Sequence, residues 1–243
     1  MLNTLPATLL SRAIDRLLPP LCPGCDRYLD DQAPFCAGCL RQLEPLPAAR
    51  CPRCALPYPA PLETGHICQA CGENPPPYDG VSAIGPYRGL LRDLVHGLKF
   101  RRLPQADSAL AQLLAGRLSE AARRCDLVAP VPLHPGRLRE RSFNQSALIA
   151  RKLARILHSN IDARLLTRTR PTGPQPGLRA EQRRVNLRGA FTARKECCGY
   201  RVLLVDDVLT TGATVAEAAR ILKQAGAAEV QVAVLGRAPR HLV

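Results

Sequence analysis

The sequence contains no tryptophan and one methionine, and aromatic residues make up only 4% of it. So few aromatic rings disfavour the binding of single-stranded nucleic acid by base stacking. No apolar run approaches the roughly 20 residues that a membrane-spanning helix needs. The N-terminal residues show no basic stretch followed by a small-residue cleavage site, so a signal peptide is not indicated. We therefore expect a cytoplasmic protein with no membrane span.

Two phosphate-binding signatures are missing as well. There is no G-K-[ST] tripeptide, which excludes a Walker A loop, and no G-x-G-x-x-G, which disfavours a dinucleotide-binding fold. The chain does have length and apolar content. Its 243 residues, 46% of them apolar, can bury a substantial core in one domain or two.

Positive charge is concentrated in the later part of the chain. The net charge is +14, from 34 basic and 20 acidic residues. Residues 1–80 hold 6 basic and 8 acidic residues, a balance of −2, which leaves 28 basic and 12 acidic residues, a balance of +16, for the remainder. An anionic ligand or nucleic acid would account for this excess, and so would a solvated basic surface.

Eight of the 11 cysteines lie between residues 22 and 71, in four C-x-x-C pairs of identical spacing. Two thiolates at positions i and i+3 bind one tetrahedral zinc ion, and two such pairs complete its four ligands. The count therefore predicts two structural zinc sites. A disulfide scaffold is disfavoured because it is typical of secreted chains. The eight predicted ligands are Cys22, Cys25, Cys36, Cys39, Cys51, Cys54, Cys68 and Cys71.

The remaining candidates for metal chemistry are weaker. His66 lies two residues before Cys68 and is either a substitute ligand or a loop residue. Cys125, Cys197 and Cys198 fall outside the paired pattern, and we expect them to be buried or incidental thiols.

We expect the chain to divide into three segments. Residues 1–20 have apolar side chains at helical spacing and end in two prolines, which predicts a short amphipathic helix. Residues 21–75 are rich in cysteine and proline and hold too few apolar side chains to fold without metal. The halves 22–39 and 51–71 repeat one scheme of knuckle, loop and knuckle, which resembles a double zinc ribbon. A run of three prolines then forms a stiff boundary before the domain 76–243.

Short apolar runs alternate with helical patterns beyond this boundary. This alternation predicts a parallel α/β sheet with helices on both faces. Strands are expected at 81–87, 126–133, 163–168, 200–208 and 229–238, and helices at 90–100, 108–124, 144–158 and 214–226.

The stretch VLLVDDVLTTGATV at 202–215 combines features that a structural turn does not require together. An apolar run suited to a buried strand ends in Asp206 and Asp207, and no basic residue follows within the next twelve. Three threonine hydroxyls come next, before a predicted helix whose N-terminus favours an anion. An acidic first turn of that helix would explain only one carboxylate. A ligand with a phosphate near vicinal hydroxyls, such as a ribose 5-phosphate, suits both the carboxylates and the loop.

VLLVDDVLTTGAT resembles the phosphoribosyl-pyrophosphate motif of type I phosphoribosyltransferases. The resemblance implies the fold of that class, a parallel α/β sheet with flanking helices, here preceded by the small zinc-ribbon module. It also implies that Asp206 and Asp207 are catalytic residues that hold the ribose hydroxyls, with Mg²⁺ accompanying the phosphoribosyl pyrophosphate. The loop implied to cradle the 5-phosphate comprises Thr210, Thr211, Gly212, Ala213 and Thr214.

A narrower resemblance covers almost the whole chain. APVPLHPGRLRERSFNQSALIARKLA at 129–154, RTRPTGPQPGLRAEQRRVNLRGAF at 168–191 and the cysteine module together are similar to the ComF (competence protein F-like, also GntX-like) family. That family usually has glycine where this chain has Ser142. The resemblance implies a role in natural transformation or DNA utilisation, with single-stranded DNA and the DNA-uptake helicase machinery as partners.

In related transferases the loop after the first core strand binds the pyrophosphate, and by resemblance that loop here is 132–144. It contains Arg137, Arg139 and Arg141, and a fork of guanidinium groups suits a leaving pyrophosphate. A solvated basic loop is the alternative reading. Lys99 either adds a further cation or has a structural role.

The polar segment 169–189 is long for a plain connection, so it is either a mobile lid over the site or a surface loop. Three functions remain open. The first is a transferase, in which an acceptor attacks the anomeric carbon as pyrophosphate leaves. The second is a non-catalytic ligand-sensing or single-stranded-DNA-binding scaffold of the competence machinery. The third is a zinc-ribbon nucleic-acid module with an attached regulatory domain.

Overall fold

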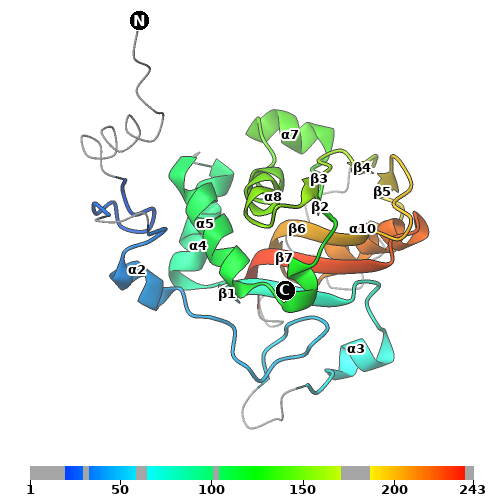
Figure 1. Cartoon of the computed structure of the whole chain (residues 1–243), viewed down its shortest axis with the longest axis horizontal. Helices are drawn as coiled ribbons and strands as arrows, with labels where there is room; N and C mark the ends of the chain where they lie inside the picture. The colour runs from blue at the N-terminus through cyan, green and yellow to red at the C-terminus, as the bar shows by residue number, and fades with distance from the viewer. Residues whose placement is uncertain (1–19, 30–32, 59–64, 101–103, 171–186, 239–243) are drawn as a thin grey trace, which may run out of the picture.

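The computed structural model describes residues 20–29, 33–58, 65–100, 104–170 and 187–238. Its centre is a five-stranded parallel sheet with the order β1-β7-β6-β2-β3, which confirms the predicted α/β fold (Figure 1). This order places β6, the strand that carries the acidic pair, in the middle of the sheet. The strands are β1 (Gly80–Pro86), β2 (Leu127–Pro130), β3 (Asn160–Ile161), β6 (Arg201–Leu209) and β7 (Glu229–Arg237).

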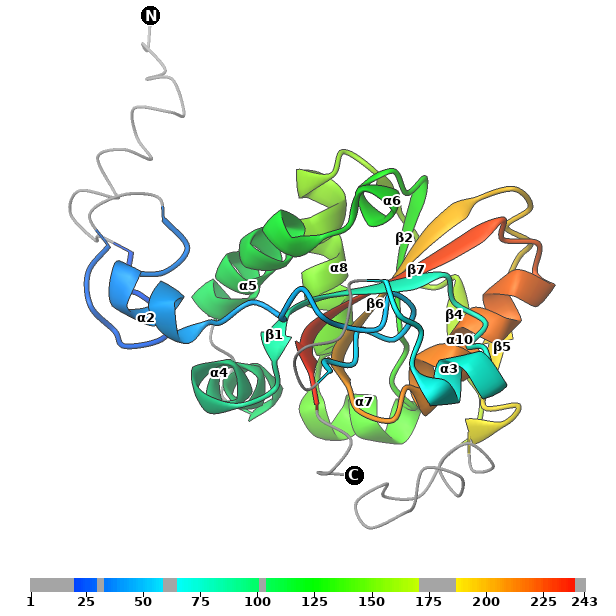
Figure 2. The same ribbon diagram turned by 90° about the horizontal axis from the view of Figure 1, so that it is seen from below.

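Both faces of the sheet are covered. Figure 2 shows α4, α5 and α8 on one side and α10 with the β4–β5 hairpin on the other. Side chains alternate along β6, so Leu203 and Val205 join the first buried cluster while Val202 and Leu204 join the second. These elements are α4 (Gly89–Phe100), α5 (Pro104–Arg117), α8 (Gln145–Ile156), α10 (Ala213–Gln224), β4 (Leu166–Arg168) and β5 (Phe191–Ala193). Within the described ranges, no helix has the length and apolar character to cross a membrane.

The single helix predicted at 108–124 is two helices in the structure. α5 ends at Arg117, and α6 (Glu120–Arg123) follows after a break. Ser119 caps α6, because its Oγ accepts a hydrogen bond from the Ala122 N–H at 3.2 Å. Its own N–H donates to Ser82 Oγ, on β1, at 3.0 Å. The break therefore depends partly on a tertiary contact that apolar spacing does not report.

The structure also contains elements that the sequence did not predict. The segment 132–144, expected as a loop, contains the short helix α7 (Pro135–Arg141). The strand predicted at 163–168 is β4, and it pairs antiparallel with β5 in a separate two-stranded sheet. The predicted N-terminal helix and most of the predicted lid lie outside the described residues.

The two halves of the cysteine module lie beside different parts of the sheet domain (Figure 2). In the first half, which holds α2 (Ala37–Gln42), Phe35 and Leu43 share a buried cluster with Leu91 of α4. The second half, which holds α3 (Gln69–Glu73), lines a cavity together with the N-terminal turns of α10. The first half thus packs on one helical layer and the second half faces the other.

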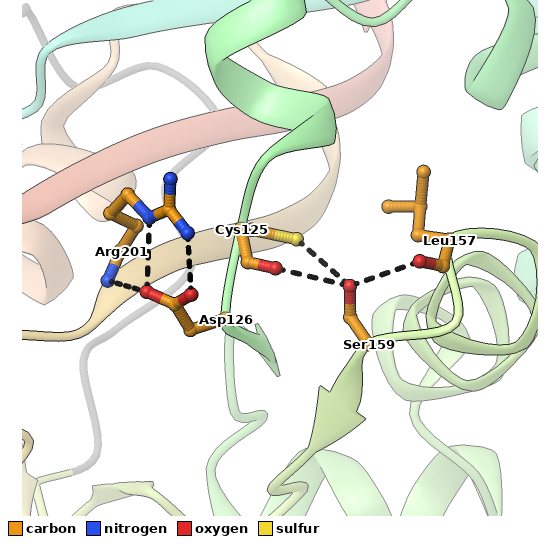
Figure 3. Close-up of polar contacts among 5 residues, drawn as sticks. All are labelled: Cys125, Asp126, Leu157, Ser159 and Arg201. Carbon is orange, nitrogen blue, oxygen red and sulfur yellow. Dashed lines mark hydrogen bonds and ion pairs between the residues drawn. The ribbon is translucent and has the colours of Figure 1, made fainter.

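Polar contacts fix the edge of the sheet where β2 and β6 begin (Figure 3). The Asp126 carboxylate accepts hydrogen bonds from Arg201 N at 2.9 Å, Nε at 3.0 Å and Nη2 at 2.7 Å. Ser159 Oγ lies 3.1 Å from the Cys125 carbonyl, which ties the entry of β3 to that of β2. Because Asp126 precedes β2 and Arg201 starts β6, these contacts align the strands whose other ends carry the candidate site.

Candidate functional site

Each half of the cysteine module gathers four thiols. Within each group all Sγ atoms lie within 4.8 Å of one another. The Sγ atoms of Cys25 and Cys36 are 3.6 Å apart, and those of Cys54 and Cys68 are 3.7 Å apart. Tetrahedral coordination with Zn–S bonds of about 2.3 Å would separate the sulfurs by about 3.8 Å. The thiols therefore fit two structural zinc sites, which we call site 1 (Cys22, Cys25, Cys36, Cys39) and site 2 (Cys51, Cys54, Cys68, Cys71).

The two zinc sites share one local geometry. The residue after the second cysteine is left-handed in both, with φ of 57° at Asp26 and 54° at Ala55. The N–H of the first cysteine donates to the carbonyl five residues later, at 2.7 Å in site 1 and 2.9 Å in site 2. His66 stands outside site 2, and its carbonyl accepts a hydrogen bond from the Tyr58 hydroxyl. Of the two readings of His66, the structure favours a loop residue.

The acidic pair lies where β2 has ended and β6 continues. Pro130, the last residue of β2, pairs with Val205 of β6. Asp206 is therefore the first residue of β6 that extends beyond the end of β2. The N-terminus of α8 occupies the space that this leaves. Ser146 Oγ donates to Asp206 Oδ1 at 3.0 Å, and Gln145 Nε2 donates to Asp207 Oδ2 at 2.8 Å.

The two carboxylates have different electrostatic surroundings. Lys99 Nζ, from the last turn of α4, lies 2.9 Å from Asp207 Oδ2, and both side chains are largely buried. Burial and the nearby charge of Asp207 raise the pKa of Asp206 to about 7, against the opposing hydrogen bonds from the Asp207 N–H and Ser146. A cation or hydroxyl donor placed beside Asp206 would stabilise its charged form.

The threonine-rich loop joins β6 to α10. Gly212 has a φ of 82°, a left-handed conformation that glycine adopts without strain, and it is the N-cap of α10. Thr211 Oγ1 accepts a hydrogen bond from the Ala213 N–H at 3.3 Å. Gly212 has no side chain that could cap the helix, so the first-turn N–H groups of α10 beyond Ala213 have no backbone partner within the helix. The loop therefore offers hydroxyls and amide donors just after the strand that carries the acidic pair.

The three predicted pyrophosphate-binding arginines lie on α7 and do not share one face. At about 100° per residue, Arg137 and Arg141 fall on the same side of the helix and Arg139 on the opposite side. Arg168, at the end of β4, is a further cation that the sequence analysis did not assign. Burial lowers the pKa of Arg168, and the charges of Asp206 and Arg137 act on it in opposite directions. Arg168 is therefore within electrostatic reach of both.

Gln145 and Ser146, which contact the acidic pair, were not predicted from the sequence. The signal available was Asn144, a helix-capping residue, and its Oδ1 does accept a hydrogen bond from the Ser146 N–H at 3.0 Å. That signal marks where α8 begins but not which strand it meets. The Gln145 Oε1 atom is buried and has no hydrogen-bond partner among the described residues.

Comparison with known proteins agrees with this architecture. The model of the double zinc ribbon domain matches residues 13–72, and that of the phosphoribosyl transferase domain matches residues 144–242. A "DNA utilization protein YhgH" of Escherichia coli O157:H7 is 41% identical over 193 residues, 77% of this chain and 83% of its own length. "Competence protein F" of Haemophilus influenzae is 35% identical over 84% of this chain and 90% of its own, and "Competence protein ComFC" of Streptococcus pneumoniae is 27% identical over 86% and 90%.

Among solved structures, the "allosteric regulatory enzyme of purine biosynthesis" aligns with 53% of this chain and 25% of its own length. The identity is 24% and the TM-score 0.36, too low to support a functional argument. The fold, the thiol groups and the family models together define a phosphoribosyltransferase-type domain with a double zinc ribbon. Within that class, the chain belongs to the ComF (competence protein F-like) family.

Proposed function

We propose that the domain 76–243 binds phosphoribosyl pyrophosphate with Mg²⁺ at the edge of the sheet where β6 ends. One observation carries the proposal. The paired carboxylates of β6 and the hydroxyl-rich loop at the start of α10 adjoin each other at the carboxyl edge of a parallel sheet. Ligands of open α/β sheets bind at such edges. The matched phosphoribosyl transferase model supports the same ligand class.

Each group has a role that suits its chemistry. Asp206 and Asp207 accept hydrogen bonds from the ribose hydroxyls and stabilise positive charge that develops on the ribose as pyrophosphate leaves. The hydroxyls and amides of Thr210 to Thr214 bind the 5-phosphate. Arg137 and Arg141, together with Arg168, suit the pyrophosphate, and Arg139 lies on the opposite side of α7. Mg²⁺ would neutralise the pyrophosphate oxygens.

The biological role that we propose is DNA utilisation or DNA uptake in the cytoplasm. The names of the E. coli and H. influenzae relatives support it, and eight thiols arranged for metal suit a reducing compartment. The second candidate function is a non-catalytic scaffold that senses the ligand and binds single-stranded DNA. The +16 balance of residues 81–243, from 28 basic and 12 acidic residues, favours this candidate.

Calorimetry with Mg²⁺ and phosphoribosyl pyrophosphate tests the ligand. Replacing both Asp206 and Asp207 by Asn keeps side-chain shape and removes charge, so affinity should fall by about 1.5–3 kcal/mol, the range for hydrogen bonds to charged groups. The matched control, Asp93→Asn with Glu120→Gln, removes the same charge from two exposed ion pairs and should bind like wild type. Equal affinities in the site variant and wild type, or no wild-type binding, would rule the proposal out. Pyrophosphate release during the titration separates a transferase from a ligand sensor.

A further inference from the structure

Arg237, the last residue of β7, is a buried arginine whose described hydrogen bonds all go to backbone carbonyls. It exposes 4% of its surface. Its Nε donates to the Cys54 carbonyl at 2.9 Å, and its Nη1 donates to the carbonyls of Leu209 at 3.0 Å and Thr210 at 2.8 Å. Truncating such a side chain would leave several buried carbonyls without a donor, which is costly.

The carbonyls that share this guanidinium belong to two different functional segments. Cys54 is a ligand of zinc site 2, and the residue after it has the left-handed conformation of the zinc knuckle. Leu209 and Thr210 lead from β6 into the loop assigned to the 5-phosphate. The guanidinium group therefore bridges zinc site 2 to the entrance of the phosphate loop.

A second observation places zinc site 2 against the same loop. The residues that line a cavity of about 270 Å³ include Cys54 and Cys71 of zinc site 2 and Thr211, Gly212 and Ala213 of the loop. Movement of the site 2 knuckle would thus change the packing around the loop as well as the position of the Cys54 carbonyl.

Zinc site 1 has a different setting. Its residues Cys22 and Cys39 belong to the buried cluster of α4 and α5. None of the described contacts joins that half of the module to the phosphate loop. The repeat therefore supplies a natural control. Cys22 and Cys51 are the first ligands of their sites, are equally buried, and accept a backbone N–H at 3.4 and 3.5 Å.

We propose that Arg237 is a positioning residue through which zinc site 2, and not site 1, holds the phosphate loop in its binding conformation. If the proposed function holds, zinc binding at site 2 and affinity for phosphoribosyl pyrophosphate are linked; this part of the inference rests on the proposed function. Linkage is reciprocal, so bound ligand should slow the release of zinc from site 2 and leave release from site 1 unchanged.

The test compares full-length wild type with Cys51→Ser, Cys22→Ser and Arg237→Lys. All measurements are made at a temperature below the thermal unfolding midpoint of every variant. Hydrogen exchange of the 209–216 amides is measured without ligand, and affinity for phosphoribosyl pyrophosphate is measured with Mg²⁺. Exchange should rise, and affinity fall, by about tenfold in the Cys51 and Arg237 variants, as expected when buried hydrogen bonds to a charged group are lost. The Cys22 variant should stay within about twofold of wild type for both, since it breaks no contact of the loop.

Arg237→Lys keeps the charge but replaces the guanidinium fork with one ammonium group, so it tests the bridge without leaving the site uncharged. Unchanged exchange in the Cys51 variant, or an equal rise in the Cys22 variant, would overturn the coupling. The exchange arm needs no ligand. If wild type fails to bind phosphoribosyl pyrophosphate, the proposed function fails while exchange still decides the coupling.

Discussion

Ser142 ends α7 in a left-handed conformation, with a φ of 64°. This backbone costs most residues free energy and glycine almost none. The family's usual glycine at this position therefore has a backbone explanation. We predict that Ser142→Gly stabilises the protein by about 0.5–1 kcal/mol, the relief of strain less the added entropy of the unfolded chain. Urea unfolding measures the difference.

Ser108→Gly is the matched control for that prediction. The exchange is the same, but Ser108 lies inside the right-handed helix α5, where glycine should destabilise by about 0.5–1 kcal/mol. Two variants with opposite signs would show that the backbone conformation decides the effect. A loss of stability in Ser142→Gly would instead point to a contact of the serine side chain.

The shifted pKa of Asp126 predicts how the free energy of unfolding depends on pH in acid. Its hydrogen bonds from Arg201 lower the pKa of Asp126 from 3.8 to about 2 in the folded protein (Figure 3). The unfolded chain therefore takes up the proton first as pH falls. The stabilising contribution is present above about pH 4 and is lost between about pH 4 and pH 2.

Urea unfolding of wild type and Asp126→Asn at several pH values checks this prediction. The wild-type advantage should be constant from about pH 7 to pH 5 and shrink toward zero near about pH 2, since the variant has no carboxyl to titrate. Both side chains are more than a third exposed, so the advantage should be small and reduced by salt. An advantage that persists at the lowest pH would contradict the assignment.

The residues of the candidate site fall into two groups: those that are neighbours in the sequence and those that only the fold brings together. The acidic pair and the threonines stand in one continuous stretch, so the sequence predicts them together. Lys99, Gln145 and Arg168 reach the same place from three other segments. Nothing in the sequence near these residues reports that contact, since it arises only when α4, α8 and β4 meet the end of β6.

At the scale of elements, α2 and α3 have six and five residues and no side-chain cap. Isolated helices of this length are unstable in water. Each starts directly after a zinc-site cysteine, Cys36 or Cys68, and contains the next one, so metal coordination should supply what propensity does not.

We predict that the purified protein holds two zinc ions and that a strong chelator releases both. Amide exchange over 20–29, 33–46 and 65–74 should then rise strongly, because the two helices lose their anchors. Amides of 202–205 and 230–234, in the central strands, should stay protected. Exchange that is unchanged after both ions have left would show that the ribbons fold without metal. A starting content well below one zinc per chain would contradict the two sites.

Elements were predictable where the periodicity was long and uninterrupted. The strand at 200–208, the helix at 214–226 and the strand at 229–238 lie close to the observed β6, α10 and β7. The predicted bounds were wrong where a tertiary contact determines the end of a helix. An example is the break before α6, where the Ser119 N–H donates a hydrogen bond to Ser82 Oγ. α7 was missed because two prolines and a glycine near its start read as a loop.

At the scale of the whole molecule, the excess of basic residues in 81–243 follows a slightly acidic first part of the chain. The structure shows three of the later arginines on α7, beside the proposed ligand site, with Arg137 and Arg139 exposed. A strand of DNA that contacts such a surface releases counterions from its phosphates, so its affinity should depend on salt.

We predict weak binding of single-stranded DNA whose affinity falls steeply as salt rises, measured by fluorescence anisotropy of a labelled oligonucleotide. If Arg139 contacts one phosphate, Arg139→Gln should reduce the slope of log affinity against log salt by about 0.7. Arg27→Gln, in the acidic first part, removes the same charge and should leave the slope unchanged. Because Arg139 lies on the side of α7 away from Arg137 and Arg141, its variant should still bind phosphoribosyl pyrophosphate like wild type. A salt-independent affinity, or none at low salt, would remove direct DNA binding from the protein's functions and leave the ligand site to act through a protein partner.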